Sequence, residues 1–112
     1  MPLFNPAGAV SGDNTVTNGN IVAATAGKGI QVKEGSNAKM GTAVLNGITE
    51  VTISTTAISA TSRVFLCVES PAGTVGGLAY VSSRIAGTSF GIKSLTIGDT
   101  STVAWLIIDP AP

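Results

Sequence analysis

Histidine is absent from this 112-residue chain, and cysteine, aromatic residues and charged residues are all scarce. Without histidine the chain lacks the usual general base, the commonest metal ligand and every Ser–His or Cys–His pair. The six acidic residues are scattered, and no two of them have the spacing of a metal-binding loop. We therefore expect no catalytic residue, no cofactor and no metal site, and we predict that the chain is not an enzyme.

Cysteine and aromatic residues are too few to define a binding site by themselves. The single Cys67 cannot form a disulfide bond within the chain, and its apolar run VFLCV predicts a buried, unreactive thiol. Trp105 also stands in an apolar run, which favours a place in the core over a binding platform. Tyr80, with glycine and serine nearby, is the better candidate for partial exposure.

Charge is low and balanced, since six Lys or Arg oppose six Asp or Glu and charged residues make up 11% of the chain. An average soluble domain has about 25% charged residues. The cations are dispersed, which argues against nucleic acid as a partner. A surface so poor in charge favours a protein that is largely covered by partner subunits, and we predict that the chain is part of an assembly. The alternative is a surface solvated by Ser and Thr hydroxyls.

No segment of the sequence predicts a membrane partner or secretion. The longest strongly apolar run, residues 104–108, is far too short to span a bilayer. The first residues, MPLFNPAG, lack both the basic and the apolar region of a signal peptide. We therefore expect synthesis in the cytoplasm.

Residues 1–20 predict an extended N-terminal arm, because Pro, Gly and Asn recur there without any sustained periodicity. Leu3, Phe4 and Val10 are isolated apolar residues in this arm. We expect this arm to lie across a neighbouring subunit of an assembly, with Leu3 and Phe4 in shallow pockets. The alternative is a frayed terminus.

Residues 21–112 predict one all-β domain, an antiparallel β-sandwich of jelly-roll type with about eight strands. Asn46-Gly47 predicts a type I′ hairpin turn between two of these strands. Residues 63–69 are apolar on both faces, which predicts a central strand covered on two sides. The predicted strands occupy residues 21–25, 30–33, 42–45, 48–54, 63–69, 78–85, 88–94 and 102–109.

A glycine-rich loop follows the strand predicted at residues 63–69. It has neither the spacing of a phosphate-binding loop nor the following helix of a dinucleotide fingerprint, so it predicts a flexible tip between strands. The functional alternative is an exposed receptor-binding tip. Its candidate residues are Gly73, Thr74, Val75, Gly76 and Tyr80.

Three segments carry a resemblance to a known family: GKGIQVKEGSNAKMGTAVL, ISATSRVFLCVESPAGTVGGLAYVSSRIAGTSFGIKS and DTSTVAWLIIDPAP. Together they resemble a small β-domain of tailed-bacteriophage virion proteins, over about three-quarters of the chain. The resemblance implies a decoration or cement protein on the capsid surface, which binds the major capsid protein, bridges neighbouring capsomers and stabilises the head. It also implies a homo-oligomer, a trimer in the first instance, because a trimer suits the three-fold points of a capsid. The arm would then contact the capsid protein or a neighbouring subunit through Leu3, Phe4 and Val10. The alternative is a receptor-binding or tail-fibre module of the virion. A soluble carbohydrate-binding module is a third hypothesis.

Overall fold

The structure, a computed structural model, describes residues 14–112, and the chain divides into the units Met1–Ile30 and Gln31–Pro112. Within the first unit, residues 14–30 contain no helix or strand, and their side chains are exposed. Leu3, Phe4 and Val10 lie outside the described residues. Their predicted contacts and the predicted arm boundary after residue 20 therefore stay predictions.

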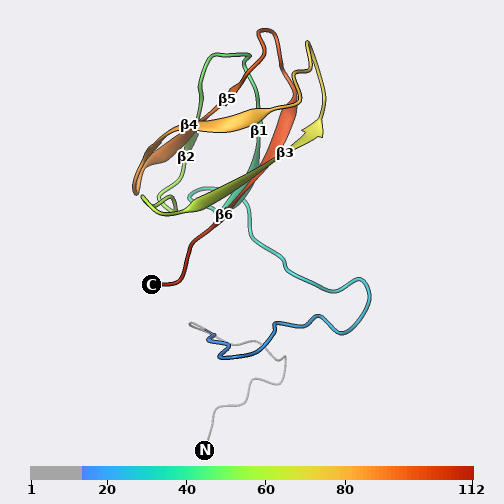
Figure 1. The fold of residues 1–112 in the computed structure, drawn as a ribbon, viewed down its shortest axis with the longest axis vertical. Coiled ribbons are helices and arrows are strands. Elements are labelled where there is room, and N and C mark those ends of the chain that lie inside the picture. Colours follow the sequence, from blue (N-terminus) through green and yellow to red (C-terminus); the bar gives the residue numbers. More distant parts are fainter. Residues whose placement is uncertain (1–13) are drawn as a thin grey trace, which may run out of the picture. The chain divides into compact units, whose positions relative to one another are not determined.

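The second unit is all-β, with two antiparallel three-stranded sheets and no helix in the described part of the chain (Figure 1). One sheet has the strand order β1-β6-β3 and the other β2-β5-β4. Nowhere in residues 14–112 is there an apolar helix that could cross a membrane. The strands are β1 (Met40–Val44), β2 (Val51–Ser54), β3 (Arg63–Ser70), β4 (Ala79–Ile85), β5 (Ser89–Ser94) and β6 (Thr102–Ile108).

Six strands form where eight were predicted, because residues 21–25 and 30–33 are not strands. Ile21 and Ile30 have 85% and 90% of their surface exposed. An alternating apolar pattern makes a strand only when a partner supplies the ladder of hydrogen bonds. No described strand pairs with either segment, and the prediction was wrong there.

The two sheets share one hydrophobic core. Phe90 of β5 and Trp105 of β6 meet edge to face, with ring centroids 5.3 Å apart and ring planes at 79°. Trp105 is 6% exposed, which confirms its predicted place in the core. We call the core-facing side of each sheet its inner face and the opposite side its outer face. The buried core residues are Leu45, Ile58, Phe90, Ile92, Val103, Trp105 and Ile107.

The Asn46-Gly47 turn does not join a hairpin, so that prediction was wrong. The chain does turn there, since the Thr49 N–H donates to the carbonyl oxygen of Asn46. However, only Gly47 has a positive φ, whereas a type I′ turn requires two such residues. The Gly47 N–H donates to Asp99 O, and the Gly47 carbonyl accepts from the Ser94 N–H. These bonds direct the chain from one sheet into the other.

The strand β3 is an edge strand, although its sequence predicts a central one. The alternation was predicted correctly, because Val64, Leu66 and Val68 pack against the core. On the outer face, Phe65 and Cys67 are exposed, and no described element covers them. The second apolar face of β3 is therefore an exposed surface of the domain and not a second contact with its interior.

Candidate functional site

An open groove lies between β3 and β4, which are edge strands of different sheets. Its volume is about 520 Å³. Edge strands leave part of their backbone N–H and C=O groups without strand partners, so a ligand there can find hydrogen-bonding groups. The groove is lined by Ser62, Arg63, Val64, Phe65, Leu66, Ala79, Tyr80, Val81 and Arg84.

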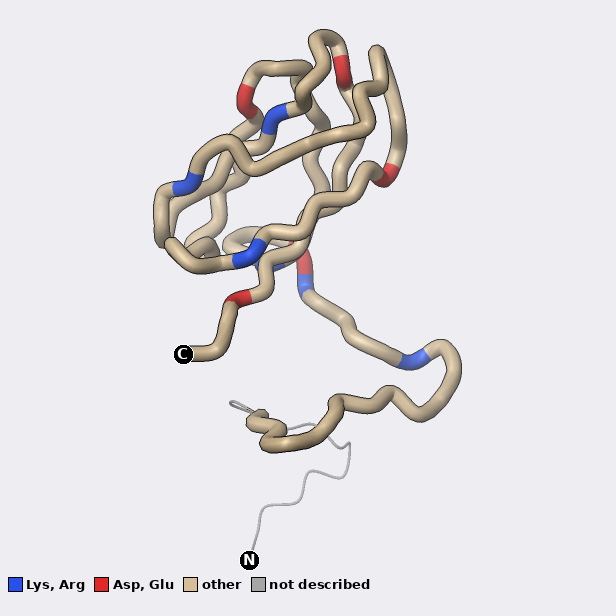
Figure 2. The backbone as a smooth tube through the Cα atoms, in the orientation of Figure 1, with Lys and Arg blue, Asp and Glu red and all other residues tan. Residues whose placement is uncertain are grey.

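Two arginines give the groove a positive charge in a protein whose charges are few and dispersed (Figure 2). Arg84 Nη1 donates to the carbonyl oxygens of Ser62 at 2.7 Å and of Ser59 at 3.2 Å. Arg63 Nη1 donates to the carbonyl oxygen of Thr61 at 3.1 Å. Both guanidinium groups are thus held by one loop, residues 59–62, and no Asp or Glu lines the groove.

A β-bulge sets the direction of Arg84. The register of β4 on β5 shifts between Val81 and Ser83, so Arg84 pairs with the buried Phe90. Without the extra residue, alternation would put residue 84 on the outer face. The bulge therefore turns Arg84 to the inner face at the end of the sheet, within reach of the 59–62 loop.

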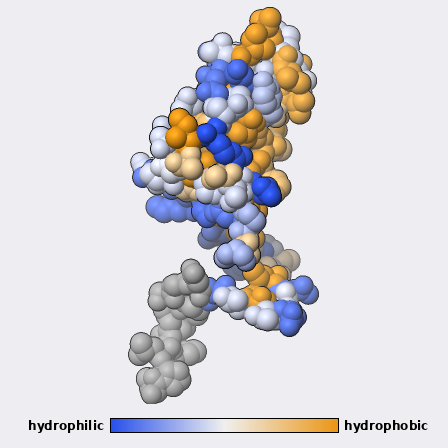
Figure 3. All heavy atoms as spheres, turned by 60° about the vertical axis from the view of Figure 1, so that its left-hand side comes forward, coloured by the Kyte–Doolittle hydropathy of each residue, from blue (hydrophilic) through white to orange (hydrophobic). Residues whose placement is uncertain are grey.

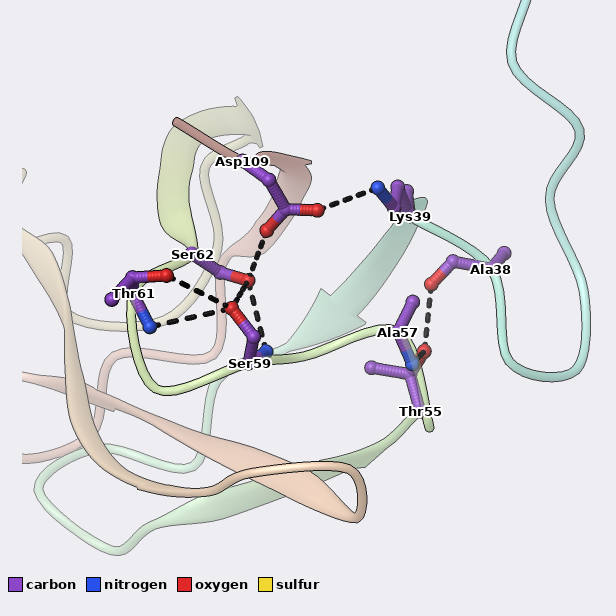
Figure 4. Close-up of polar contacts among 8 residues, drawn as sticks. All are labelled: Ala38, Lys39, Thr55, Ala57, Ser59, Thr61, Ser62 and Asp109. Atoms are coloured by element: carbon purple, nitrogen blue, oxygen red, sulfur yellow. Dashed lines mark hydrogen bonds and ion pairs between the residues drawn. The ribbon is translucent and has the colours of Figure 1, made fainter. Parts of the chain in front are cut away.

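A polar network fixes the 59–62 loop (Figure 4). The buried Ser62 hydroxyl accepts from the Ser59 N–H at 2.9 Å and donates to Asp109 Oδ1 at 2.5 Å. Lys39 forms an ion pair of 2.6 Å with the other oxygen of Asp109. The hydrogen bonds from Lys39 and Ser62 lower the pKa of Asp109. These bonds connect the end of β6 and the start of β1 to the 59–62 loop, which holds both arginines.

Two aromatic side chains flank the same groove. Phe65 of β3 is 55% exposed, and Tyr80 of β4 is 39% exposed, which confirms the partial exposure predicted for Tyr80. Aromatic faces exposed beside donors of hydrogen bonds are typical of sites for ligands with an apolar side and a polar rim.

Three loops meet at one end of the second unit, around the buried carboxylate of Asp99. Asp99 accepts from the Ser101 N–H at 3.0 Å, the Ser94 hydroxyl at 2.9 Å and the Gly76 N–H at 3.3 Å. The Ser101 hydroxyl and N–H, with smaller contributions from Ser94 and Gly76, lower the pKa of Asp99 to about 2. A carboxylate held by several donors is stabilised in its charged form.

The glycine-rich loop predicted as a tip belongs to this loop end. Residues 73–76 are exposed, yet the Thr74 N–H donates to Gly98 O, and Gly73 forms a bridge with Asp99. Figure 3 shows apolar side chains gathered at the upper end of the molecule, where these loops lie in Figure 1. The exposed apolar residues of the three loops are Ile48, Val75, Leu78, Leu95 and Ile97.

The outer faces of the two sheets differ in chemistry. On the β2–β5–β4 sheet, the Glu50 carboxylate lies over Gly91 and accepts from the hydroxyls of Ser82 and Ser83 at 2.5 and 2.8 Å. These two hydroxyls, and Lys93 more weakly, lower the pKa of Glu50. The outer face of the β1–β6–β3 sheet is mostly apolar instead. It carries Met40, Val44, Phe65, Cys67, Ala104, Leu106 and Ile108.

The thiol of Cys67 is exposed, so the prediction of a buried thiol was wrong. Cys67 lies on the outer face of β3, opposite Ala104, where the strand's second apolar face stays uncovered. Among residues 14–112, no three His, Cys, Asp or Glu side chains lie close enough to hold a metal ion.

Residues 37–108 match the family described as the K1 capsule-specific polysaccharide lyase, C-terminal domain. The match covers more than half of the chain and all six strands, and the chain belongs to this family. No curated protein and no solved structure matches the chain. By this description the family is the C-terminal domain of an enzyme that is specific for a capsule polysaccharide.

The groove was not predicted from the sequence. Arg63 and Arg84 stand on different strands, and neither belongs to a motif. The available signal was the pair of strands that each carry an arginine at one end and an aromatic residue a few positions away: Arg63 with Phe65, and Arg84 with Tyr80.

Proposed function

We propose that the chain is a non-catalytic module of a bacteriophage tail protein and that it binds polysaccharide at the host surface. The family match of residues 37–108 carries this proposal, because a capsule-specific polysaccharide lyase acts on the outermost layer of a bacterium and is of the phage tail-spike type. The receptor-binding or tail-fibre alternative of the sequence analysis is therefore better supported than capsid decoration.

The described residues suit binding more than cleavage. The groove offers two arginines, two aromatic rings and a serine. Bond cleavage in a polysaccharide needs a positioned proton donor or acceptor, usually a histidine or carboxyl group. Of the side chains lining the groove only the Tyr80 phenol is a usual proton donor or acceptor, and no histidine or carboxyl group lies beside it there. We infer that catalysis, where it accompanies this family, resides outside this domain.

The apolar outer face of the β1–β6–β3 sheet supports a proposal of self-association. Exposed apolar patches of this kind mark interaction surfaces, and the β2–β5–β4 sheet carries polar groups in the corresponding place. We propose that copies of the chain associate, as a trimer, through the part of this face around Val44, Ala104 and Cys67, which leaves Phe65 free at the wall of the groove. We also propose that the two sheets pack as the predicted β-sandwich, since Phe90 and Trp105 meet in one core.

Immunogold electron microscopy of virions, with an antibody against this chain, tests the location. Label on the tail supports the proposal, and label spread over the head overturns it in favour of decoration. As a functional measurement, the purified chain should compete with phage adsorption to encapsulated host cells and should not bind cells from which the capsule has been removed.

A further inference from the structure

We propose that the groove between β3 and β4 binds carboxylated sugar residues of an acidic polysaccharide. The guanidinium groups of Arg63 and Arg84 would contact the carboxylate, and the rings of Phe65 and Tyr80 would pack against the sugar. This inference rests on the proposed function and names the site and the ligand class. The groove volume of about 520 Å³ lies within the usual range of small-ligand sites, about 300–1,000 Å³.

Charge decides the class of sugar. The groove lining contains two cations and no acid. Within residues 14–112 the one ion pair joins Lys39 to Asp109, so neither groove arginine has a carboxylate partner there. A guanidinium group has five N–H donors arranged as a fork that fits a carboxylate. Because a single Nη1 of each arginine is used by the 59–62 loop, donors remain for a ligand.

The arginines are also held in place before any ligand arrives. Arg84 is fixed by two carbonyl oxygens, and the loop that provides them is fixed by the Ser62 hydroxyl and Asp109. Binding to an ordered side chain costs less conformational entropy than binding to a free one. A phosphate ion would need the same donors, but it gives the aromatic rings of Phe65 and Tyr80 nothing to pack against.

The aromatic pair favours a sugar over a simple anion. The C–H groups of a sugar ring carry a partial positive charge, and the face of an aromatic ring is negative. Phe65 and Tyr80 come from opposite walls of the groove, and both are exposed. Since the groove is open and not an enclosed cavity, a long polysaccharide can pass along it without its chain ends being required.

Two-dimensional NMR of the full chain, labelled with ¹⁵N, tests the proposal. The probes are three carboxylated hexasaccharides: hyaluronan hexamer, hexagalacturonate and an α2,8-linked sialic acid hexamer. The controls are neutral chitohexaose and sodium phosphate. We expect saturable shifts of the Phe65 and Tyr80 amide signals and of the arginine Nε signals with at least one acidic hexamer. Equal shifts with chitohexaose, shifts with phosphate alone, or no groove shift with any acidic hexamer would overturn the proposal.

Variants separate a specific contact from general attraction between charges. Arg63→Gln removes one groove cation and should weaken binding of the acidic hexamer about tenfold, the effect of losing one charge-assisted hydrogen bond. Lys33→Gln removes the same charge from an exposed residue that does not line the groove, and binding should stay within about twofold. Equal weakening by both variants would overturn the assignment to the groove. Tyr80→Ala should weaken binding as well, with unchanged unfolding temperature.

The outcomes also separate this inference from the proposed function. If the chain competes with phage adsorption but the NMR signals of the groove do not shift with the acidic hexamers, the proposed tail function stands and the groove is not the binding site. If the chain is not found on the tail and does not compete with adsorption, the proposed function is wrong, whatever the chain binds in solution.

Discussion

Gly41 of β1 and Trp105 of β6 are direct partners in the strand register, and the indole ring lies over the glycine. A Cβ atom at residue 41 would stand 2.7 Å from Cζ2 and 2.9 Å from Cε2 of the indole. Both residues are buried, so the ring has little room to move. Because Gly41 has no side chain, the indole ring of Trp105 on the neighbouring strand can occupy the space above it.

We expect Gly41→Ala to destabilise the protein by about 1–3 kcal/mol, the usual effect of adding a methyl group to a filled core. For a domain of this size that corresponds to a fall in melting temperature of about 4–8 °C for each kcal/mol. Differential scanning calorimetry measures it. Gly29→Ala is the control, since no atom lies within 4 Å of the added Cβ and its φ is ordinary. An unchanged melting temperature for Gly41→Ala would contradict the contact.

The hydrogen bonds that the Asp99 carboxylate accepts from Ser94, Ser101 and Gly76 predict that the free energy of unfolding falls in acid. The folded-state pKa of Asp99 is about 2, below its ordinary value of 3.8, so the unfolded chain takes up the proton more readily. The stabilisation is complete above pH 3.8 and is lost as the pH falls towards 2. Urea unfolding at several pH values should therefore show a declining midpoint across this window.

Asp99→Asn should lower stability at neutral pH and flatten the decline in acid, because an amide cannot accept from all the donors around it. Some decline will remain, since Glu50 and Asp109 also have lowered pKa values. Glu34→Gln, at an exposed acid, serves as the control. If both variants show the same dependence on pH as the native chain, Asp99 does not have the proposed role.

Ser62 links the stability of the domain to the groove. Ser62→Ala removes the acceptor of the Ser59 N–H and the donor to Asp109. We expect destabilisation of about 1–3 kcal/mol, typical of leaving a partly buried polar group unsatisfied, together with weaker binding of acidic hexamers. Thr61→Ala, in the same loop but exposed, should change neither property appreciably. Loss of stability with undiminished binding would show that Arg84 does not depend on this loop.

The exposed thiol of Cys67 reports on the proposed association through the β1–β6–β3 sheet. In dilute protein we expect rapid labelling by a maleimide reagent, because Cys67 is exposed on β3. Labelling should slow as concentration rises and copies cover this face. Val44→Glu, on the same face, should restore rapid labelling and lower the mass measured by light scattering.

Thr52→Glu provides the matched control for Val44→Glu, since Thr52 lies on the outer face of the other sheet, opposite Gly91. It should leave both labelling and mass as in the native chain. Labelling that is independent of concentration, with a monomeric mass throughout, would end the proposal of self-association by this face.

The alternation of apolar and polar residues predicted the six strands that have a partner strand. It failed where the structure of a segment depends on residues far away in the sequence. The two strands of the β4–β5 hairpin were predicted, at residues 78–85 and 88–94, and they are adjacent in the chain, with Gly87 supplying the positive φ of the turn between them. Residues 21–33 have similar alternation but no partner strand. Asn46-Gly47 has the residues of a hairpin, yet bonds to Asp99 and Ser94 redirect it. Such bonds join loops far apart in sequence, and no local signal carries them.

The groove shows the same limit. Strand alternation correctly put Val64 and Leu66 on one face of β3 and Phe65 on the other, but it could not say that β3 lies at an edge, where Phe65 stays exposed. Nor does the sequence Ser82-Ser83-Arg84 reveal the bulge that turns Arg84 towards the 59–62 loop. Predicting this site required knowledge of which strands are neighbours and where their register shifts.

The strand β6 is the centre of its sheet and the last strand along the chain. During synthesis, β2, β5 and β4 can pair as soon as Ser94 has left the ribosome, whereas β1 and β3 must wait for Thr102–Ile108. Until then both carry unpaired backbone edges, and long-range pairing of this kind is slow. A chain cut short before residue 102 would thus have one complete sheet and two strands with unpaired backbone edges, which favours aggregation.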